Sequence, residues 1–177
     1  MAYEYGTLFI EKIKLERENY MTDIVYNATH ATALPAKVLA RDHGAHIISL
    51  VLAKDTDNGA LLGKGAFVST GDLDAYDEAD AKIFNGVIEA YENGHYLVEV
   101  KGDTDAYLVY QDPIIDGSDL TSVKRNAHYF YNKQGDYVRS YQLKDGDTFW
   151  LSPEGFDGKP EVGKTLTVGR KPKVVTG

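Results

Sequence analysis

Three Asn-Gly pairs constrain the fold of this chain more than any other feature of its sequence: Asn58-Gly59, Asn85-Gly86 and Asn93-Gly94. Asn-Gly supplies two residues that adopt positive φ, which the type I′ turn of a β-hairpin requires. Short segments rich in β-branched and aromatic residues follow the second and third pairs, at Val87–Tyr91 and His95–Val100. This spacing predicts a meander of short antiparallel strands.

A helix is the competing interpretation for the start of this meander. Five apolar residues there also fit helical spacing: Ile83, Phe84, Val87, Ile88 and Tyr91. Such a helix would carry Asn85-Gly86 in its middle, at a cost of about 1 kcal/mol or more, so strands are favoured. Leu8–Arg17 fits a strand and a short helix almost equally well, and both alternatives stay open.

The rest of the chain continues the β pattern. Ala36–Ala40 and Ile47–Ala53 begin the β-region, and later strands are predicted at Ala106–Tyr110, Ala127–Tyr131, Asp136–Leu143, Thr148–Leu151 and Lys164–Val168. Strands this short and evenly spaced predict an all-β fold, an antiparallel barrel or sandwich with an extended N-terminal arm. We therefore expect an arm at residues 1–35, a β-domain at 36–168 and a basic tail at 169–177.

Composition excludes several classes of protein. The 177 residues suit about one domain, and the absence of cysteine excludes disulfides, thiolate catalysis and cysteine-based zinc sites. No apolar run approaches the roughly 20 residues of a membrane span, and the N-terminus has no secretory signal. The net charge of −8 would repel nucleic acid and anionic lipid, so we expect neither as a partner.

No motif reaches the spacing that catalysis or metal binding requires. The sequence Gly59–Gly65 has one residue too few for a phosphate loop, and Asp55–Gly59 departs from a calcium loop and is better interpreted as a hairpin turn. A solvated acidic loop is preferred to a cation site for the cluster Asp72, Asp74, Asp77, Glu78 and Asp80. We therefore expect no enzyme activity, no catalytic residue, no metal and no cofactor.

Tyrosine is unusually frequent, with 13 in the chain. Eight lie in the predicted meander: Tyr91, Tyr96, Tyr107, Tyr110, Tyr129, Tyr131, Tyr137 and Tyr141. Tyrosine suits protein interfaces because it has a large apolar body and a polar tip. Cross-strand pairing in a β-protein explains the same residues equally well, and both alternatives stay open.

Four runs carry a family resemblance: residues 81–100, 105–115, 129–141 and 144–168. Within them, a Gly-Asp turn at Gly146-Asp147 precedes one short strand, and Val162-Gly163 precedes the final one. These runs resemble tailed-bacteriophage structural proteins of the capsid decoration, cement or head-fibre kind. The resemblance implies a non-enzymatic virion protein, synthesised in the bacterial cytoplasm, that binds the outside of a capsid and reinforces it. The implied partner is the major capsid protein.

Two segments are the predicted partner-binding regions. The arm carries apolar anchors on a segment too short to form its own core, and such segments order by packing on a partner; these anchors are Tyr3, Tyr5, Leu8, Phe9 and Ile13. The tail residues Arg170, Lys171 and Lys173 are expected to meet an acidic patch on that partner or on a neighbouring copy, which makes a homo-oligomer the expected state. A β-sandwich carbohydrate-binding module is the alternative function.

Overall fold

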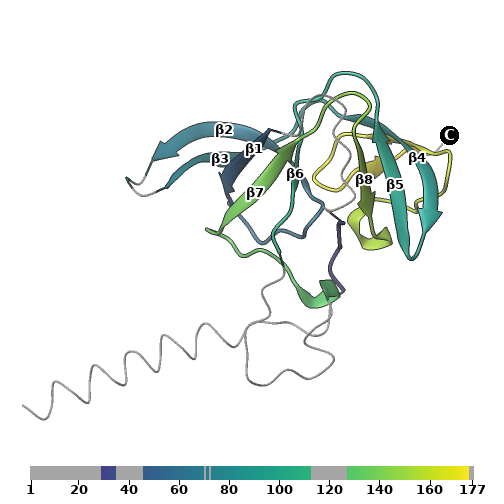
Figure 1. Ribbon diagram of the computed structural model, residues 1–177, viewed down its shortest axis with the longest axis horizontal. Helices are drawn as coiled ribbons and strands as arrows, with labels where there is room; N and C mark the ends of the chain where they lie inside the picture. Colours follow the sequence, from purple (N-terminus) through teal and green to yellow (C-terminus); the bar gives the residue numbers. More distant parts are fainter. Residues whose placement is uncertain (1–28, 35–45, 70, 72, 113–126, 176–177) are drawn as a thin grey trace, which may run out of the picture.

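The computed structural model describes residues 29–34, 46–69, 71, 73–112 and 127–175, and these form a closed barrel and a second sheet side by side (Figure 1). The described residues contain strands and two short 3₁₀ turns but no α-helix, so the predicted all-β class is confirmed. The strands are β1 Ile47–Val51, β2 Leu61–Ser69, β3 Asp74–Asp80, β4 Asn85–Glu92, β5 His95–Val100, β6 Tyr107–Val109, β7 Tyr137–Gln142, β8 Thr148–Leu151, β9 Thr165–Thr167 and β10 Lys173–Val174. The 3₁₀ turns are η2 Ala127–Tyr129 and η3 Pro153–Gly155.

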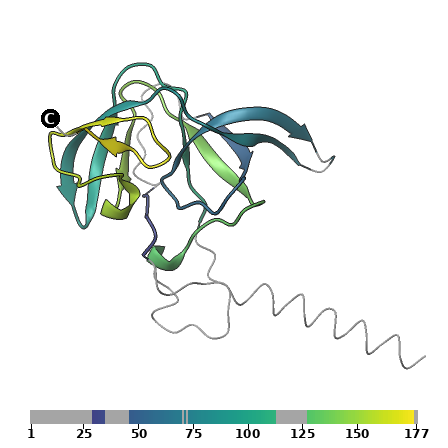
Figure 2. The ribbon, with the colours of Figure 1, turned by 180° about the vertical axis from the view of Figure 1, so that it is seen from behind.

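The barrel has the strand order β1-β3-β2-β6-β7 and closes through the pairing of β7 with β1. The β1–β3 pair is parallel and the other pairs are antiparallel. The β2–β3 hairpin is longer than the barrel wall, and its outer end projects away from the rest of the molecule in both views (Figures 1 and 2).

The second sheet has the order β10-β9-β4-β5-β8. Its β4–β5 hairpin turns at Asn93 and Gly94, with φ of 50° and 81°, so the turn predicted from this Asn-Gly pair is confirmed. A register shift between Ile88 and Ala90 marks a β-bulge in β4. The strand alternative for Ile83–Tyr91 is therefore correct from Asn85 onward, and the helix alternative is wrong.

Two apolar cores lie back to back across the shared barrel wall. On β2, Leu62 packs inside the barrel whereas Leu61 faces the second sheet. On β6, Val109 packs inside the barrel and Leu108 faces the second sheet, because successive side chains of a strand point to opposite faces. This explains why all three residues of β6 are buried, as expected for a strand covered on both sides.

Four local predictions are wrong. Asn85-Gly86 begins β4 instead of forming a turn, and Gly86 does not have positive φ. The predicted acidic loop is largely strand β3, because Ala75 is buried and Tyr76 packs on the barrel core. Residues 55–59 form no hairpin turn, since β1 and β2 are not neighbours, and the predicted strand Ala127–Tyr131 starts as a 3₁₀ turn.

The domain boundaries also differ from the predicted ones. The last residues of the predicted arm belong to the domain, because Ala31, Thr32 and Ala33 are all buried. The predicted tail contributes β10, which pairs with β9 and completes the second sheet. The predicted strand at Ala36–Ala40 and the alternatives for Leu8–Arg17 lie outside the described residues.

Candidate functional site

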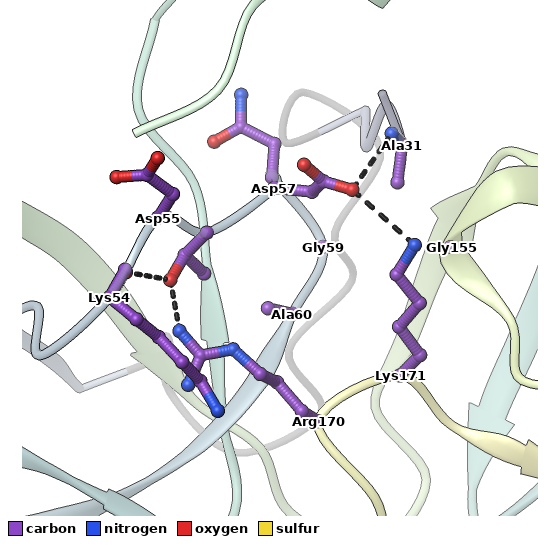
Figure 3. Close-up of a pocket in the computed structure, with 11 residues that line it drawn as sticks. Ala31, Lys54, Asp55, Asp57, Gly59, Ala60, Gly155, Arg170 and Lys171 are labelled. Atoms are coloured by element: carbon purple, nitrogen blue, oxygen red, sulfur yellow. Dashed lines mark hydrogen bonds and ion pairs between the residues drawn. The ribbon is translucent and has the colours of Figure 1, made fainter. Parts of the chain in front are cut away.

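A pocket of about 190 Å³ lies where the barrel meets the second sheet. The β1–β2 connection forms one wall, from Lys54 to Ala60, and the chain at Arg170 and Lys171 forms another (Figure 3). Ala31 and Gly155 complete the lining. Segments distant in the sequence therefore meet here, and we call this region the junction.

Buried polar side chains hold the β1–β2 connection in place. The backbone N–H groups of Thr56 and Asn132 each donate to the other residue's carbonyl at 2.8 Å. The Asn132 amide also donates to the Thr56 carbonyl at 3.0 Å and to Asn58 Oδ1 at 3.2 Å. Asn58 in turn exchanges two hydrogen bonds with the backbone of Gln111. Because all three side chains are at most 4 % exposed, each of these bonds satisfies a group that water does not reach.

An ion pair crosses the junction. The Arg170 guanidinium donates to both carboxylate oxygens of Glu78 and to the hydroxyl of Thr56. Glu78 also accepts the backbone N–H of Ala53 at 3.0 Å. The Glu78 side chain is only 8 % exposed, so its charge depends on these donors for compensation.

A second polar contact, at Asp57, joins the N-terminal segment to the same connection. Asp57 lies 3.5 Å from Nζ of Lys171 (Figure 3) and 2.7 Å from Nδ1 of His30. The Lys171 ammonium also donates to the Glu154 carbonyl. The His30 ring stacks on Tyr131 with centroids 4.9 Å apart. Asp57 thus links three segments of the chain at one carboxylate.

Residues 30–34 extend the second sheet beyond β8. Ala33 forms an antiparallel bridge with Leu151, and the N–H of Ser152 donates to the Thr32 carbonyl at 2.9 Å. The Thr32 N–H donates to Ser152 Oγ, also at 2.9 Å, and the Thr32 hydroxyl contacts Nε2 of His95. Both backbone and side-chain hydrogen bonds therefore hold residues 30–34 against the second sheet.

Glu154 lies beside this segment and has a perturbed acidity. Burial alone would raise its pKa, but the hydrogen bond with Ser152, its own backbone N–H and the histidines His128 and His95 lower it. The net result is a pKa below the usual 4.5. The carboxylate is therefore the favoured form of Glu154 in the folded protein.

The junction offers little for catalysis or metal binding. Two of its three cations, Arg170 and Lys171, face Glu78 and Asp57 and help to join the two sheets, whereas Lys54 lines the pocket without an ion pair to a described residue. Within the part of the chain that the structure describes, no cluster of three or more His, Asp or Glu side chains could hold a metal ion. In that same part, no helix has the length and apolar character needed to cross a membrane.

The projecting hairpin is a second candidate site, and we define it as residues 65–69 of β2, Leu73, and residues 74–77 of β3. In the described chain, β2 pairs with β6 only at Leu61 and Leu62, and β1 pairs with β3 at Tyr76 and Asp77. The hairpin is therefore two-stranded only beyond the Phe67–Tyr76 pair, at residues 68–69 and 74–75. Its exposed apolar residues include Phe67 at 58 % and Leu73 at 55 %. The Phe67 ring meets Tyr76 edge-on at 5.4 Å, which orders it at the surface.

The predicted partner-binding residues are placed only in part. Tyr3, Tyr5, Leu8, Phe9 and Ile13 lie outside the described residues. Arg170 and Lys171 are engaged within the chain, whereas Lys173 is exposed on β10. Sequence reasoning missed Asn58, Asn132 and His30, because nothing in the sequence signals that such distant segments meet.

Comparisons with known proteins identify no relative. A scan against protein-family models, a search of curated proteins and a search of solved structures each give no match.

Proposed function

We propose that this chain is a non-enzymatic virion structural protein that binds the outer surface of a phage capsid and reinforces or decorates it. The observation that best supports this is the clamping of residues 30–34 between β8 and the junction. This clamp fixes the point at which residues 1–28 join the β-domain. We propose that the apolar anchors of the preceding residues bind the partner.

The proposed partner is the major capsid protein, and the proposed location is the virion. Binding through an arm suits this role because a structural protein must hold to a large surface, which several dispersed anchors do well. The anchors are Tyr3, Tyr5, Leu8, Phe9 and Ile13. The Asp57 carboxylate of the junction supports the same role through its contacts with His30 and the Ala31 N–H.

Capsid pelleting tests this proposal. Particles of a phage that encodes the chain are mixed with the full-length protein, or with a variant lacking residues 1–20, and sedimented. The deletion leaves residues 30–34 in place, so we expect an unchanged melting temperature and binding weakened by about tenfold or more. Equal occupancy of the truncated protein would refute the role of the arm. Failure of the full-length protein to sediment with particles would refute the capsid role.

A carbohydrate-binding module is the second candidate, and one observation favours it. Tyr91 is 56 % exposed and lies over Tyr96 with ring centroids 4.6 Å apart, and Tyr96 in turn meets Phe156 edge-on. An exposed, supported ring is the usual platform for a sugar. If this alternative holds, glycan binding will be measurable by calorimetry and Tyr91→Ala will abolish it, while capsid pelleting will be absent.

A further inference from the structure

The projecting hairpin exposes more apolar surface than its own fold requires. Phe67 is 58 % exposed and lies opposite Tyr76, where the pairing of β3 with β1 ends. Beyond this pair the hairpin is a two-stranded ribbon, which alone is marginally stable in water. The Lys64 ammonium lies 4.6 Å from the centroid of the Tyr76 ring and helps to hold this cluster in place. An ordered apolar side chain at the end of a projection is a typical anchor for binding another protein.

The charge of this hairpin indicates what covers it. Between residues 65 and 80 the sequence has five acidic residues and no Lys or Arg. Asp74 and Asp77 are exposed and form no ion pair with any described residue. Among the described acidic residues of this stretch, Glu78 at the base of the hairpin is the one that forms an ion pair, with Arg170. The partner surface should therefore be basic with apolar residues beside the cations.

The same chain carries such a surface at its other end, and we call residues 164–175 the C-terminal edge. This edge has four Lys or Arg residues and no acid. Arg170 and Lys171 are engaged at the junction by Glu78 and Asp57, so the cations of the outward surface are Lys164 and Lys173. Lys173 of β10 lies opposite Thr167 of β9 and is exposed, while Val174 packs on the core of the second sheet. Because strand side chains alternate, Lys173 and Val175 share the outward face, and Val175 is 42 % exposed. Lys164 stands at the start of β9 and forms no ion pair with a described residue.

We infer that the projecting hairpin of one copy docks on the C-terminal edge of a second copy. The two surfaces lie at opposite ends of the molecule, with the hairpin on the left of Figure 1 and the C-terminus on the right. One copy therefore cannot satisfy both surfaces by itself. Contact between unlike surfaces is head-to-tail, and it continues from copy to copy into a ring or an open chain.

Opposite charges at the contact give a clear dependence on salt. The net charge of −8 makes copies repel each other as a whole, so association requires the local complementarity of the two surfaces. Salt screens such exposed charges over about 10 Å at 0.1 M. Association should therefore weaken with ionic strength, while the apolar contact of Phe67 remains.

Sedimentation equilibrium of the full chain tests this inference without any capsid. At about 100 μM protein and low salt, we expect an average mass well above the 19.6 kDa of one copy. The double variant Asp74→Lys with Asp77→Lys and the double variant Lys164→Glu with Lys173→Glu should each sediment as monomers. An equimolar mixture of the two should associate again, because each supplies the charge that the other now lacks.

Controls separate this contact from general effects of charge and folding. Glu92→Lys with Asp103→Lys changes the net charge equally at exposed positions elsewhere and should leave association unchanged. Phe67→Ser should weaken association about tenfold or more, whereas Ile83→Ser, at a similarly exposed residue, should not. A monomeric wild type, associating charge variants or a mixture that stays monomeric would each overturn the inference. These outcomes do not depend on capsid binding, so the two proposals fail separately.

Discussion

The junction and the projecting hairpin use polar and apolar residues in opposite ways. At the junction, polar side chains are buried and paired, as in Asn58 with Gln111 and Glu78 with Arg170. On the hairpin, Phe67 is exposed and Asp74 has no ion-pair partner in the described chain. The difference supports a junction that stabilises the fold and our proposal that the hairpin contacts another molecule.

Removing the Asn58 side chain should give the largest loss of stability. Asn58→Ala leaves the backbone N–H and carbonyl of Gln111 without their partner in a buried site. We expect a loss of about 3 kcal/mol in the free energy of unfolding, and a melting temperature lower by roughly 10 °C. Calorimetry is the measurement. The control is Asn85→Ala at an exposed strand position, and an equal effect of both variants would contradict the role of the junction.

Removing the ion pair between Glu78 and Arg170 should give the second-largest loss of stability. Glu78→Gln removes a buried charge and leaves Arg170 facing a neutral amide, so we expect a loss of about 2 kcal/mol in urea unfolding. Glu89→Gln is the matched control, since Glu89 is 44 % exposed and its carboxylate lies 3.9 Å from Lys101. Solvent-exposed ion pairs contribute about 0–1 kcal/mol to the free energy of unfolding. If Glu89→Gln proved as costly as Glu78→Gln, burial would not be what makes the junction pair important.

Glu154 should give a smaller effect that depends on pH. Its pKa in the folded protein is below the ordinary 4.5, so the folded state favours the carboxylate. The stability it contributes is present above pH 4.5 and is lost as the pH falls through the lower pKa of the folded state. We expect Glu154→Gln to reduce stability at pH 6 by less than about 1 kcal/mol and to reduce it less at pH 3. A constant difference between variant and wild type at the two pH values would argue against this account.

The hairpin should give the smallest effect on stability. Phe67→Ser removes an exposed ring, so we expect the free energy of unfolding to change by no more than about 0.5 kcal/mol, measured below the concentration at which copies associate. A loss of 2 kcal/mol, on the order of a core substitution, would mean that Phe67 packs for stability and not for contact.

Local sequence patterns predicted the strands well because the needed information lies in neighbouring residues. The predicted His95–Val100 and Thr148–Leu151 match β5 and β8 residue for residue. Asn93-Gly94 turns as expected, whereas the identical Asn85-Gly86 lies in a strand that pairs with β5 and β9. At Asn85-Gly86, one of the three Asn-Gly pairs, pairing with neighbouring strands thus overrode the local preference for a turn.

The junction could not be predicted because its contacts join residues far apart in sequence. Thr56 meets Asn132 across 76 positions and Glu78 meets Arg170 across 92. A single sequence contains no sign of such pairings when the residues are ordinary polar types. The acidic stretch at residues 72–80 was visible, but its strand character depends on packing beneath Ala75 and Tyr76.

Amide hydrogen exchange on the full-length protein, free and bound at saturation to capsids, tests the central claim most directly. The account predicts slow and unchanged exchange at the junction, at residues 54–60 and 130–132. Binding should slow exchange in the arm, residues 1–28, and in the hairpin, residues 65–69 and 73–77, where copies meet on the particle. Identical exchange in both samples, or new protection confined to the junction, would contradict the division of the molecule into a stabilising region and contacting surfaces.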